Sequence, residues 1–247
     1  GIVSYYRYPD ASIVAVRNDG VILRVVDNTP STLSDAHVAN FSSASFSADG
    51  SKILILAGQQ PNVQANIFET ATASWRAIPG SFRGSAWSPK GTQLAVLVPD
   101  TKTGKTSVAL YNPEAGKTIR TVATLAFGDV AISWPASTTI IVQDKATARS
   151  TGSAWAIDVP TGKITLAARG KQGFTSLWDN TGSQGIVFQS NPATGRGGSL
   201  RIVRDTLDRG GFAFTTLPEK CAFFSMPGSA STTIPHVICG VPQDQAA

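Results

Sequence analysis

The sequence contains no long hydrophobic run. Its longest apolar stretches, Ile53–Ala57 and Leu94–Pro99, have the length of β-strands, whereas a membrane-spanning helix needs about 20 apolar residues. No helical periodicity extends beyond a turn or two. The chain also begins without a methionine or a basic-then-apolar leader, so we expect it to be a mature portion or a fragment of a longer protein.

Histidine is scarce as well, with only His37 and His236 in the whole chain. The two are far apart in sequence, and neither lies in a metal-ligand spacing such as His-x-x-x-His. No Gly-x-Ser-x-Gly motif is present to supply a nucleophilic serine beside one of them. We therefore predict no catalytic residue, no metal site and no cofactor, and we assign both histidines surface or structural roles.

Two other kinds of enzymatic site are a phosphate-binding loop and a pair of catalytic carboxylates. The glycine-rich segment Gly195–Gly198 lacks the Lys-Ser/Thr pair that completes a phosphate-binding loop. Most carboxylates lie in turns, where an aspartate usually accepts hydrogen bonds from nearby backbone N–H groups. A pair of carboxylates brought together by folding stays open, because sequence alone does not exclude it.

The chain has few charged residues, and its net charge is mildly positive. Charged residues make up 15% of the chain and the formal net charge is +5, which argues against disorder. The 21 lysines and arginines are scattered through the sequence, whereas nucleic-acid-binding proteins usually concentrate them on one element. This balance favours an anionic partner and argues against nucleic acid.

A repeated pattern is the strongest feature of the sequence. "FSADGSKILILA" at 46–57 and "WSPKGTQLAVLV" at 87–98 share an aromatic residue, a serine, a polar turn with glycine and an aliphatic run. Looser copies begin at Trp134, Trp178 and Phe224, so that the aromatic positions recur every 41 to 47 residues. This period is typical of the four-stranded blade of a β-propeller.

Each repeat also has a second half, in which two short apolar strands flank a polar turn such as Pro160–Lys163. The fold class that we predict is therefore all-β, a β-propeller or a large fragment of one, with about five to six four-stranded antiparallel blades represented. We predict one domain over residues 1–247, with blades starting near residues 43, 84, 131, 175 and 221. Residues 1–40 are predicted to supply the outer strands of an incomplete N-terminal blade, and the last repeat to stop after two strands.

The repeats at 46–57 and 87–98 resemble the repeat of TolB and its relatives, the WD40-like β-propellers, which has an aromatic residue, Ser-Pro-Asp-Gly and an aliphatic strand. The copies at Trp134 and Trp178 depart from this pattern. The segments "LPEKCAFFS" (217–225) and "VICGVP" (237–242) are similar to uncharacterised bacterial propellers that are membrane-anchored. The resemblance implies a propeller of the bacterial envelope, located in the periplasm or at the cell surface, and such propellers occur in binding proteins and as accessory domains of enzymes.

The tryptophans and cysteines are assigned structural roles. Trp87, Trp134 and Trp178 occupy the same position in their repeats, so we expect them to pack between blades rather than to stack on a ligand. Cys221 and Cys239 flank a hairpin-like segment, and adjacent antiparallel strands would bring them within bonding distance. We predict a disulfide if the protein lies outside the cytoplasm; two buried free thiols are the alternative.

The long polar loops carry the predicted binding site. In a propeller, the loop after the second strand of a blade and the connection to the next blade share one face. Eight basic residues fall in these segments: Arg83, Lys102, Lys105, Lys145, Arg149, Lys171, Arg196 and Lys220. We predict that this loop face binds a protein or another anionic component of the envelope.

The function that we predict is that of a non-enzymatic binding or scaffold module, with contact to a membrane only through an upstream anchor. The alternative is an enzyme, either a propeller hydrolase or lyase, or the accessory propeller domain of a larger enzyme. The sequence makes no prediction of the oligomeric state or of the ligand.

Overall fold

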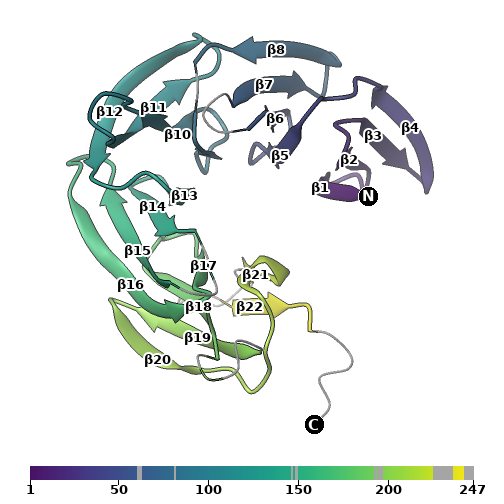
Figure 1. Ribbon diagram of the computed structural model, residues 1–247. Helices are drawn as coiled ribbons and strands as arrows, with labels where there is room; N and C mark the ends of the chain where they lie inside the picture. Colours follow the sequence, from purple (N-terminus) through teal and green to yellow (C-terminus); the bar gives the residue numbers. More distant parts are fainter. Residues whose placement is uncertain are drawn as a thin grey trace. The chain divides into compact units, whose positions relative to one another are not determined.

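The computed structural model describes residues 1–59, 63–80, 82–145, 147, 150–191, 193, 197–224 and 236–241, and for Lys171 the backbone alone. The chain forms two compact units, an N-terminal unit (Gly1–Gly128) and a C-terminal unit (Asp129–Ala247). Almost every regular element is a β-strand (Figure 1). Among the described residues, no helix combines the length and the apolar character needed to cross a bilayer.

The N-terminal unit contains three four-stranded sheets. Sheet 1 consists of β1 (Ile2–Arg7), β2 (Ile13–Arg17), β3 (Ile22–Val26) and β4 (Thr29–Ser34). Sheet 2 consists of β5 (Phe41–Phe46), β6 (Lys52–Ala57), β7 (Gln64–Glu69) and β8 (Ser74–Ile78). Sheet 3 consists of β9 (Ser85–Trp87), β10 (Leu94–Pro99), β11 (Thr106–Asn112) and β12 (Lys117–Leu125).

The C-terminal unit contains two more four-stranded sheets and a two-stranded one. Sheet 4 consists of β13 (Val130–Ala136), β14 (Thr139–Asp144), β15 (Thr151–Asp158) and β16 (Ile164–Gln172). Sheet 5 consists of β17 (Thr175–Trp178), β18 (Gln184–Ser190), β19 (Gly198–Arg204) and β20 (Leu207–Gly211). A 3₁₀ turn, η1 (Pro218–Lys220), leads into sheet 6, which pairs β21 (Cys221–Phe224) with β22 (His236–Cys239).

Every four-stranded sheet is an antiparallel meander in which the strands pair in the order of the chain. This is the topology of a propeller blade, so the predicted fold class and the predicted repeat are confirmed. Of the last repeat, the described residues form the two strands of sheet 6. The prediction for residues 1–40 is wrong, because this segment forms the complete sheet 1. Its first strand cannot be recognised from the sequence, because four of its six side chains are exposed and form no apolar run.

The second strand of each four-stranded sheet is covered on both faces. Ile53, Leu54 and Ile55 of β6 are each at most 2% exposed. Ile53 and Ile55 pack with residues of sheet 1, whereas Leu54 packs with residues of sheet 3. A strand buried on both faces reads as a continuous aliphatic run rather than as an alternating pattern, which explains the aliphatic half of the repeat.

The predicted packing role of the repeated tryptophans agrees with the structure. Trp87, Trp134 and Trp178 are each 7–8% exposed. Trp87 and Trp178 belong to hydrophobic clusters that join neighbouring sheets. The indole N–H of Trp87 also donates a hydrogen bond of 3.1 Å to the carbonyl oxygen of Ser45 in sheet 2. Trp87 and Trp178 therefore each pack their own sheet against the one before it.

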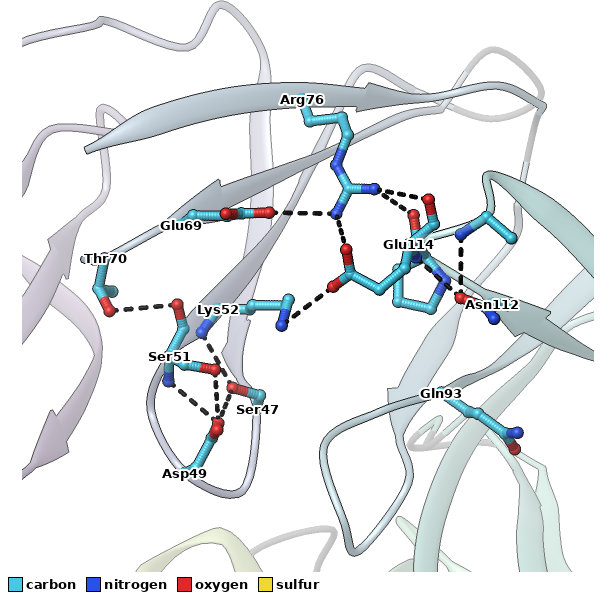
Figure 2. A network of polar contacts seen from close by, with 12 residues as sticks. Ser47, Asp49, Ser51, Lys52, Glu69, Thr70, Arg76, Gln93, Asn112 and Glu114 are labelled. Carbon is cyan, nitrogen blue, oxygen red and sulfur yellow. Dashed lines mark hydrogen bonds and ion pairs between the residues drawn. The ribbon is translucent and has the colours of Figure 1, made fainter. Parts of the chain in front are cut away.

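The polar half of the repeat forms a compact turn between the first and second strands. In sheet 2, the Gly50 N–H donates to the Ser47 carbonyl (2.9 Å) and the Lys52 N–H to Ser47 Oγ (3.0 Å). Asp49 Oδ1 accepts from Ser47 Oγ and from the Ser51 N–H, at 2.6 and 3.0 Å. Figure 2 shows this turn beside the ion pairs of its sheet.

Two later sheets use the same turn with other residues. In sheet 3, Ser88 Oγ accepts from the Gln93 N–H at 3.1 Å. In sheet 5, Asp179 takes the place of the serine, and its Oδ1 accepts from the N–H groups of Ser183 and Gln184 at 3.1 and 3.3 Å. An aspartate can do this because a carboxylate is an acceptor with several lone pairs.

Neighbouring turns lie side by side within each unit. The Tyr8 hydroxyl of sheet 1 donates to the Gly50 carbonyl of sheet 2 (2.7 Å). A Cβ added at Gly91 of sheet 3 would lie 3.1 Å from the backbone nitrogen of Ala48, and one at Gly182 of sheet 5 would lie 2.9 Å from a methyl carbon of Thr139 in sheet 4. The glycines of the repeat are therefore needed both for a positive φ and for close approach.

Charged side chains add a second link between sheets 2 and 3. Glu114, in the turn between β11 and β12, pairs with Lys52 of β6 (3.1 Å) and with Arg76 of β8 (3.5 Å). Arg76 also pairs with Glu69 of β7 (3.2 Å) and donates a short hydrogen bond to the Pro113 carbonyl. Figure 2 shows the guanidinium of Arg76 between the two carboxylates, so Glu114 is held by cations of the adjacent sheet.

Sheet 6 is closed by the predicted disulfide. Cys221 and Cys239 are bonded and stand directly opposite each other on β21 and β22, with their Cα atoms 4.0 Å apart. The bond links residues 18 positions apart. A crosslink of a loop of this size stabilises a fold by about 3 kcal/mol in the loop-entropy account.

We expect the substitutions Gly50→Ala and Gly104→Ala to separate the two reasons for a glycine in a turn. Both glycines have φ near +70°, so either substitution costs about 1–2 kcal/mol for the left-handed backbone. A Cβ at residue 50 would in addition overlap the ring of Tyr6, whereas one at residue 104 meets nothing within 4 Å. The free energy of unfolding in urea should fall by about 1–3 kcal/mol more for Gly50→Ala. Equal losses would contradict the proposed close packing of sheets 1 and 2.

Candidate functional site

The predicted binding loops share one end of their sheets within each unit. In sheet 3, Ser85 pairs with Val96 and Pro99 with Thr106, so the connection that enters β9 and the loop that leaves β10 lie together. The side-by-side turns described above occupy the other end. In the C-terminal unit, the Ser190 hydroxyl donates to the Gln172 carbonyl (2.7 Å), which places the end of β18 beside the end of β16. We call this end of the sheets the loop end.

The loop between β10 and β11 is held by Asp100. Its carboxylate accepts hydrogen bonds from the N–H groups of Lys102 and Thr103, at 2.9 and 3.4 Å, and from the Thr103 hydroxyl at 2.6 Å. The Asp100 N–H donates to the Lys105 carbonyl at 2.9 Å. Lys102 and Lys105 are exposed on this turn, and among the described residues neither ammonium group has an ion-pair partner.

The same turn occurs at the opposite end of sheet 4. Asp158 accepts from the N–H (2.9 Å) and the hydroxyl (2.5 Å) of Thr161, and its own N–H donates to the Lys163 carbonyl. Both turns follow the pattern Asp-x-x-Thr-Gly-Lys, at 100–105 and 158–163. The loop between β10 and β11 is therefore a rigid hairpin turn rather than a loose loop.

Arg83 has a different environment from Lys102 and Lys105. It is half-buried, and its N–H donates to the Leu97 carbonyl at 2.8 Å. Its guanidinium fills the space beside Gly128, where a Cβ would overlap Nη1. The buried hydroxyl of Thr106 lies at the same place, 2.9 Å from that Cβ position. Arg83 therefore packs against the loop end of sheet 3 rather than projecting from it.

The remaining predicted residues belong to the C-terminal unit. Lys145 follows β14 at the loop end and pairs with Asp129 at 2.7 Å. Lys171 lies near the end of β16, which reaches the same end. Lys220 is exposed in η1, directly before β21. Arg149 and Arg196 lie outside the described residues. Binding by these residues stays a prediction.

The turn aspartates stabilise their own turns. Four aspartates accept hydrogen bonds from N–H and hydroxyl groups of their own turns: Asp49, Asp100, Asp158 and Asp179. His37 is exposed and lies 3.7 Å from Asp19. Among the described residues, no three His, Cys, Asp or Glu side chains are grouped so as to hold a metal ion.

A pocket in the C-terminal unit was missed by the sequence analysis. It has a volume of about 650 Å³ and lies between the outer strands of sheet 5 and β22. Its lining consists of Gln184, Ile202, Arg204, Arg209, Phe212, His236 and Val237. The segment "RIVRDTLDRGG" (201–211) offered a clue in the sequence, because it combines apolar and basic residues in an outer strand pair.

The four-stranded antiparallel sheets, with strands paired in chain order, define a fold class, the β-propellers. TolB from Acinetobacter baumannii is similar over 83% of this chain and 52% of its own, with a TM-score of 0.58 and 17% identity. Putative TolB from Agrobacterium tumefaciens is similar over 82% of this chain and 76% of its own, with a TM-score of 0.54 and 11% identity. The chain thus spans about half the length of the first of these proteins.

Peptidases contain similar propellers. A prolyl endopeptidase structure matches 91% of this chain and 37% of its own, with a TM-score of 0.60 and 11% identity. The β-propeller domain of the Trilobed protease from Pyrococcus furiosus matches 85% and 70%, with a TM-score of 0.56 and 13% identity. No protein-family model and no curated protein sequence matches the chain. At these identities the comparisons establish the fold alone.

We expect the Asp100 turn to loosen only at strongly acidic pH. Hydrogen bonds from Thr103 and Lys102 hold the pKa of Asp100 below its ordinary value. Since the folded pKa is the lower one, the stabilising effect of the carboxylate is complete above the pKa of an unstructured aspartate, about 3.9, and disappears as the pH falls through the folded pKa.

The measurement is an NMR titration of the Lys102 and Thr103 amide resonances. Their midpoint should lie below that of a free peptide with the sequence of residues 100–105. Coincident midpoints would show that the carboxylate does not hold the turn.

Proposed function

We propose that this protein is a non-enzymatic binding module that acts outside the cytoplasm and recognises an anionic partner through its loop end. The observation that carries the proposal is the pair of exposed ammonium groups of Lys102 and Lys105 on the turn that Asp100 holds. The backbone of this turn is fixed before a partner arrives, so little conformational entropy of the backbone is lost on binding.

The physical basis of recognition is electrostatic. Two exposed cations on a fixed turn attract carboxylates, phosphates or sulfates, and they raise the rate of encounter more than they raise the final affinity. Exposed charges are screened by salt, with a Debye length of about 8 Å at physiological ionic strength. Binding through this turn should therefore weaken as salt is added.

Two observations support a location outside the cytoplasm. The blades are similar to those of TolB proteins, and sheet 6 contains the Cys221–Cys239 disulfide. Disulfides persist in oxidising compartments such as the periplasm and are rare in the cytosol. The bacterial envelope is the place that we propose for this module.

The test of the binding face compares two double variants of equal charge in sheet 3. Lys102→Gln/Lys105→Gln removes the cations of the loop end, and Lys90→Gln/Lys117→Gln removes two exposed cations at the opposite end. With heparin as a polyanionic probe at low salt, we expect the first variant to bind roughly tenfold more weakly and the second to bind like the wild type. Equal losses in both variants would show that only net charge matters, and no loss in the first would refute a role for the loop end.

A second candidate function is that of an accessory propeller domain in a larger enzyme. The observation that favours it is the extent of the prolyl endopeptidase match. The match covers 91% of this chain and 37% of the enzyme's chain. An intact mass of the protein purified from its natural source decides between the two. A chain long enough to carry a catalytic domain, with peptidase activity on fluorogenic peptides, would support the enzyme; a chain without either supports the binding module.

A further inference from the structure

Sheet 6 differs from every other sheet in the number of its strands. Sheets 1 to 5 each have four strands, whereas the described residues of sheet 6 pair β21 with β22 alone. Because the strands follow the order of the chain, β21 and β22 occupy the first and second positions of a blade. Among the residues that the structure describes, the third and fourth positions of sheet 6 are not filled, and the outer edge of β22 has no strand beside it.

The pocket of the C-terminal unit lies where those two strands would pack. Ile202 and Arg204 of β19 and Arg209 of β20 come from the outer half of sheet 5, and His236 and Val237 come from β22. On the other face of sheet 5, Val203 of β19 is covered by the outer strands of sheet 4, through Ala154, Ala167 and Ala168. The pocket therefore lies beside the two positions of sheet 6 that the described residues leave unfilled.

The alternation along β19 explains the composition of the pocket. Val203 is 7% exposed and faces sheet 4, so its neighbours Ile202 and Arg204 face the other way, toward sheet 6. Ile202 supplies an apolar surface together with Phe212 and Val237. One face of β19 therefore presents an apolar and a basic side chain two residues apart.

The two arginines of the pocket are available to a partner. Arg204 and Arg209 are both exposed, and in the part of the chain that the structure describes neither side chain has an ion pair or a hydrogen bond. Arg201, on the opposite face of β19, is by contrast paired with Asp208. Guanidinium groups that border an apolar surface select for carboxylates.

The free edge of β22 can also donate and accept backbone hydrogen bonds. The Gly240 N–H donates to the Lys220 carbonyl at 2.8 Å, so the backbone groups of residue 240 point toward β21. Since these directions alternate along a strand, the N–H and C=O groups of Val237 and Cys239 point to the outer edge. The disulfide keeps β22 in register with β21 and so holds this edge as a fixed template.

We propose that an acidic, extended segment of a partner protein adds as a third strand to the free edge of β22 and fills the pocket. Strand addition supplies backbone hydrogen bonds for affinity, while the side chains that enter the pocket supply specificity. The spacing of Ile202 and Arg204 requires apolar and acidic residues to alternate at every second position of the bound segment. This site is separate from the loop end that we propose for anionic partners, and it lies in the other unit from Lys102 and Lys105.

The test uses a capped peptide with the sequence Val-Val-Glu-Glu-Val-Val-Glu-Glu, in which every second position alternates between valine and glutamate. We expect it to bind the full chain and to slow hydrogen exchange at the amides of Val237 and Cys239. The variant Arg204→Gln/Arg209→Gln should bind it roughly tenfold more weakly. The control Arg7→Gln/Arg169→Gln loses the same charge elsewhere and should bind it like the wild type, and circular dichroism should show that both variants are folded.

Three results would overturn the proposal. A fully N-methylated peptide that binds as well as the parent would show that no strand is added. Slow exchange of the Val237 and Cys239 amides in the free protein would show that the edge is already covered, by this chain or by a second copy. No binding of the parent peptide would exclude an acidic strand. The variant Lys102→Gln/Lys105→Gln should bind the peptide normally, so its loss of heparin binding reports on the loop end alone.

Discussion

The packing of the blades depends on one constraint, which is that a four-stranded sheet has two apolar faces and both must be covered. Sheet 2 has a neighbouring sheet on each side to provide this cover, because Ile53 and Leu54 of β6 face sheets 1 and 3 respectively. Close approach of whole sheets requires small residues where their turns meet, which is why Gly91 and Gly182 lie against the preceding turns. In sheets 3 and 5, Trp87 and Trp178 before these turns pack against the preceding sheet.

Polar interactions follow the same geometry. The turns between first and second strands use serine or aspartate to satisfy their own N–H groups, as at Ser47 and Asp179. Lys52, Arg76 and Glu114 connect two sheets at one end. These groups are occupied in holding the sheets together, whereas Lys102 and Lys105 at the loop end and Arg204 and Arg209 in the pocket are exposed.

The pocket lies where the described part of sheet 6 has two strands and sheet 5 has four. Among the described residues, the outer strands of sheet 5 have no sheet 6 strand opposite them, and the outer edge of β22 has no neighbour. In sheet 5 the uncovered face carries Arg204 and Arg209 beside Ile202. Natural sheets usually protect such edges with charge or with a covering segment; here the charge borders a pocket large enough for side chains.

The sequence by itself determined the class of the fold, the starts of the repeats, the role of Trp87 and Trp178 and the pairing of Cys221 with Cys239. These features are local or recur at a fixed spacing, so they can be recognised in a single chain. It did not reveal that residues 1–40 form a complete sheet, because the exposed strand Ile2–Arg7 has no apolar run. Only the tertiary structure decided that Arg83 is half-buried while Lys102 is exposed, and that Arg204, Arg209 and His236 share a pocket, because these outcomes depend on which sheet faces lie against each other and which are left without a neighbour.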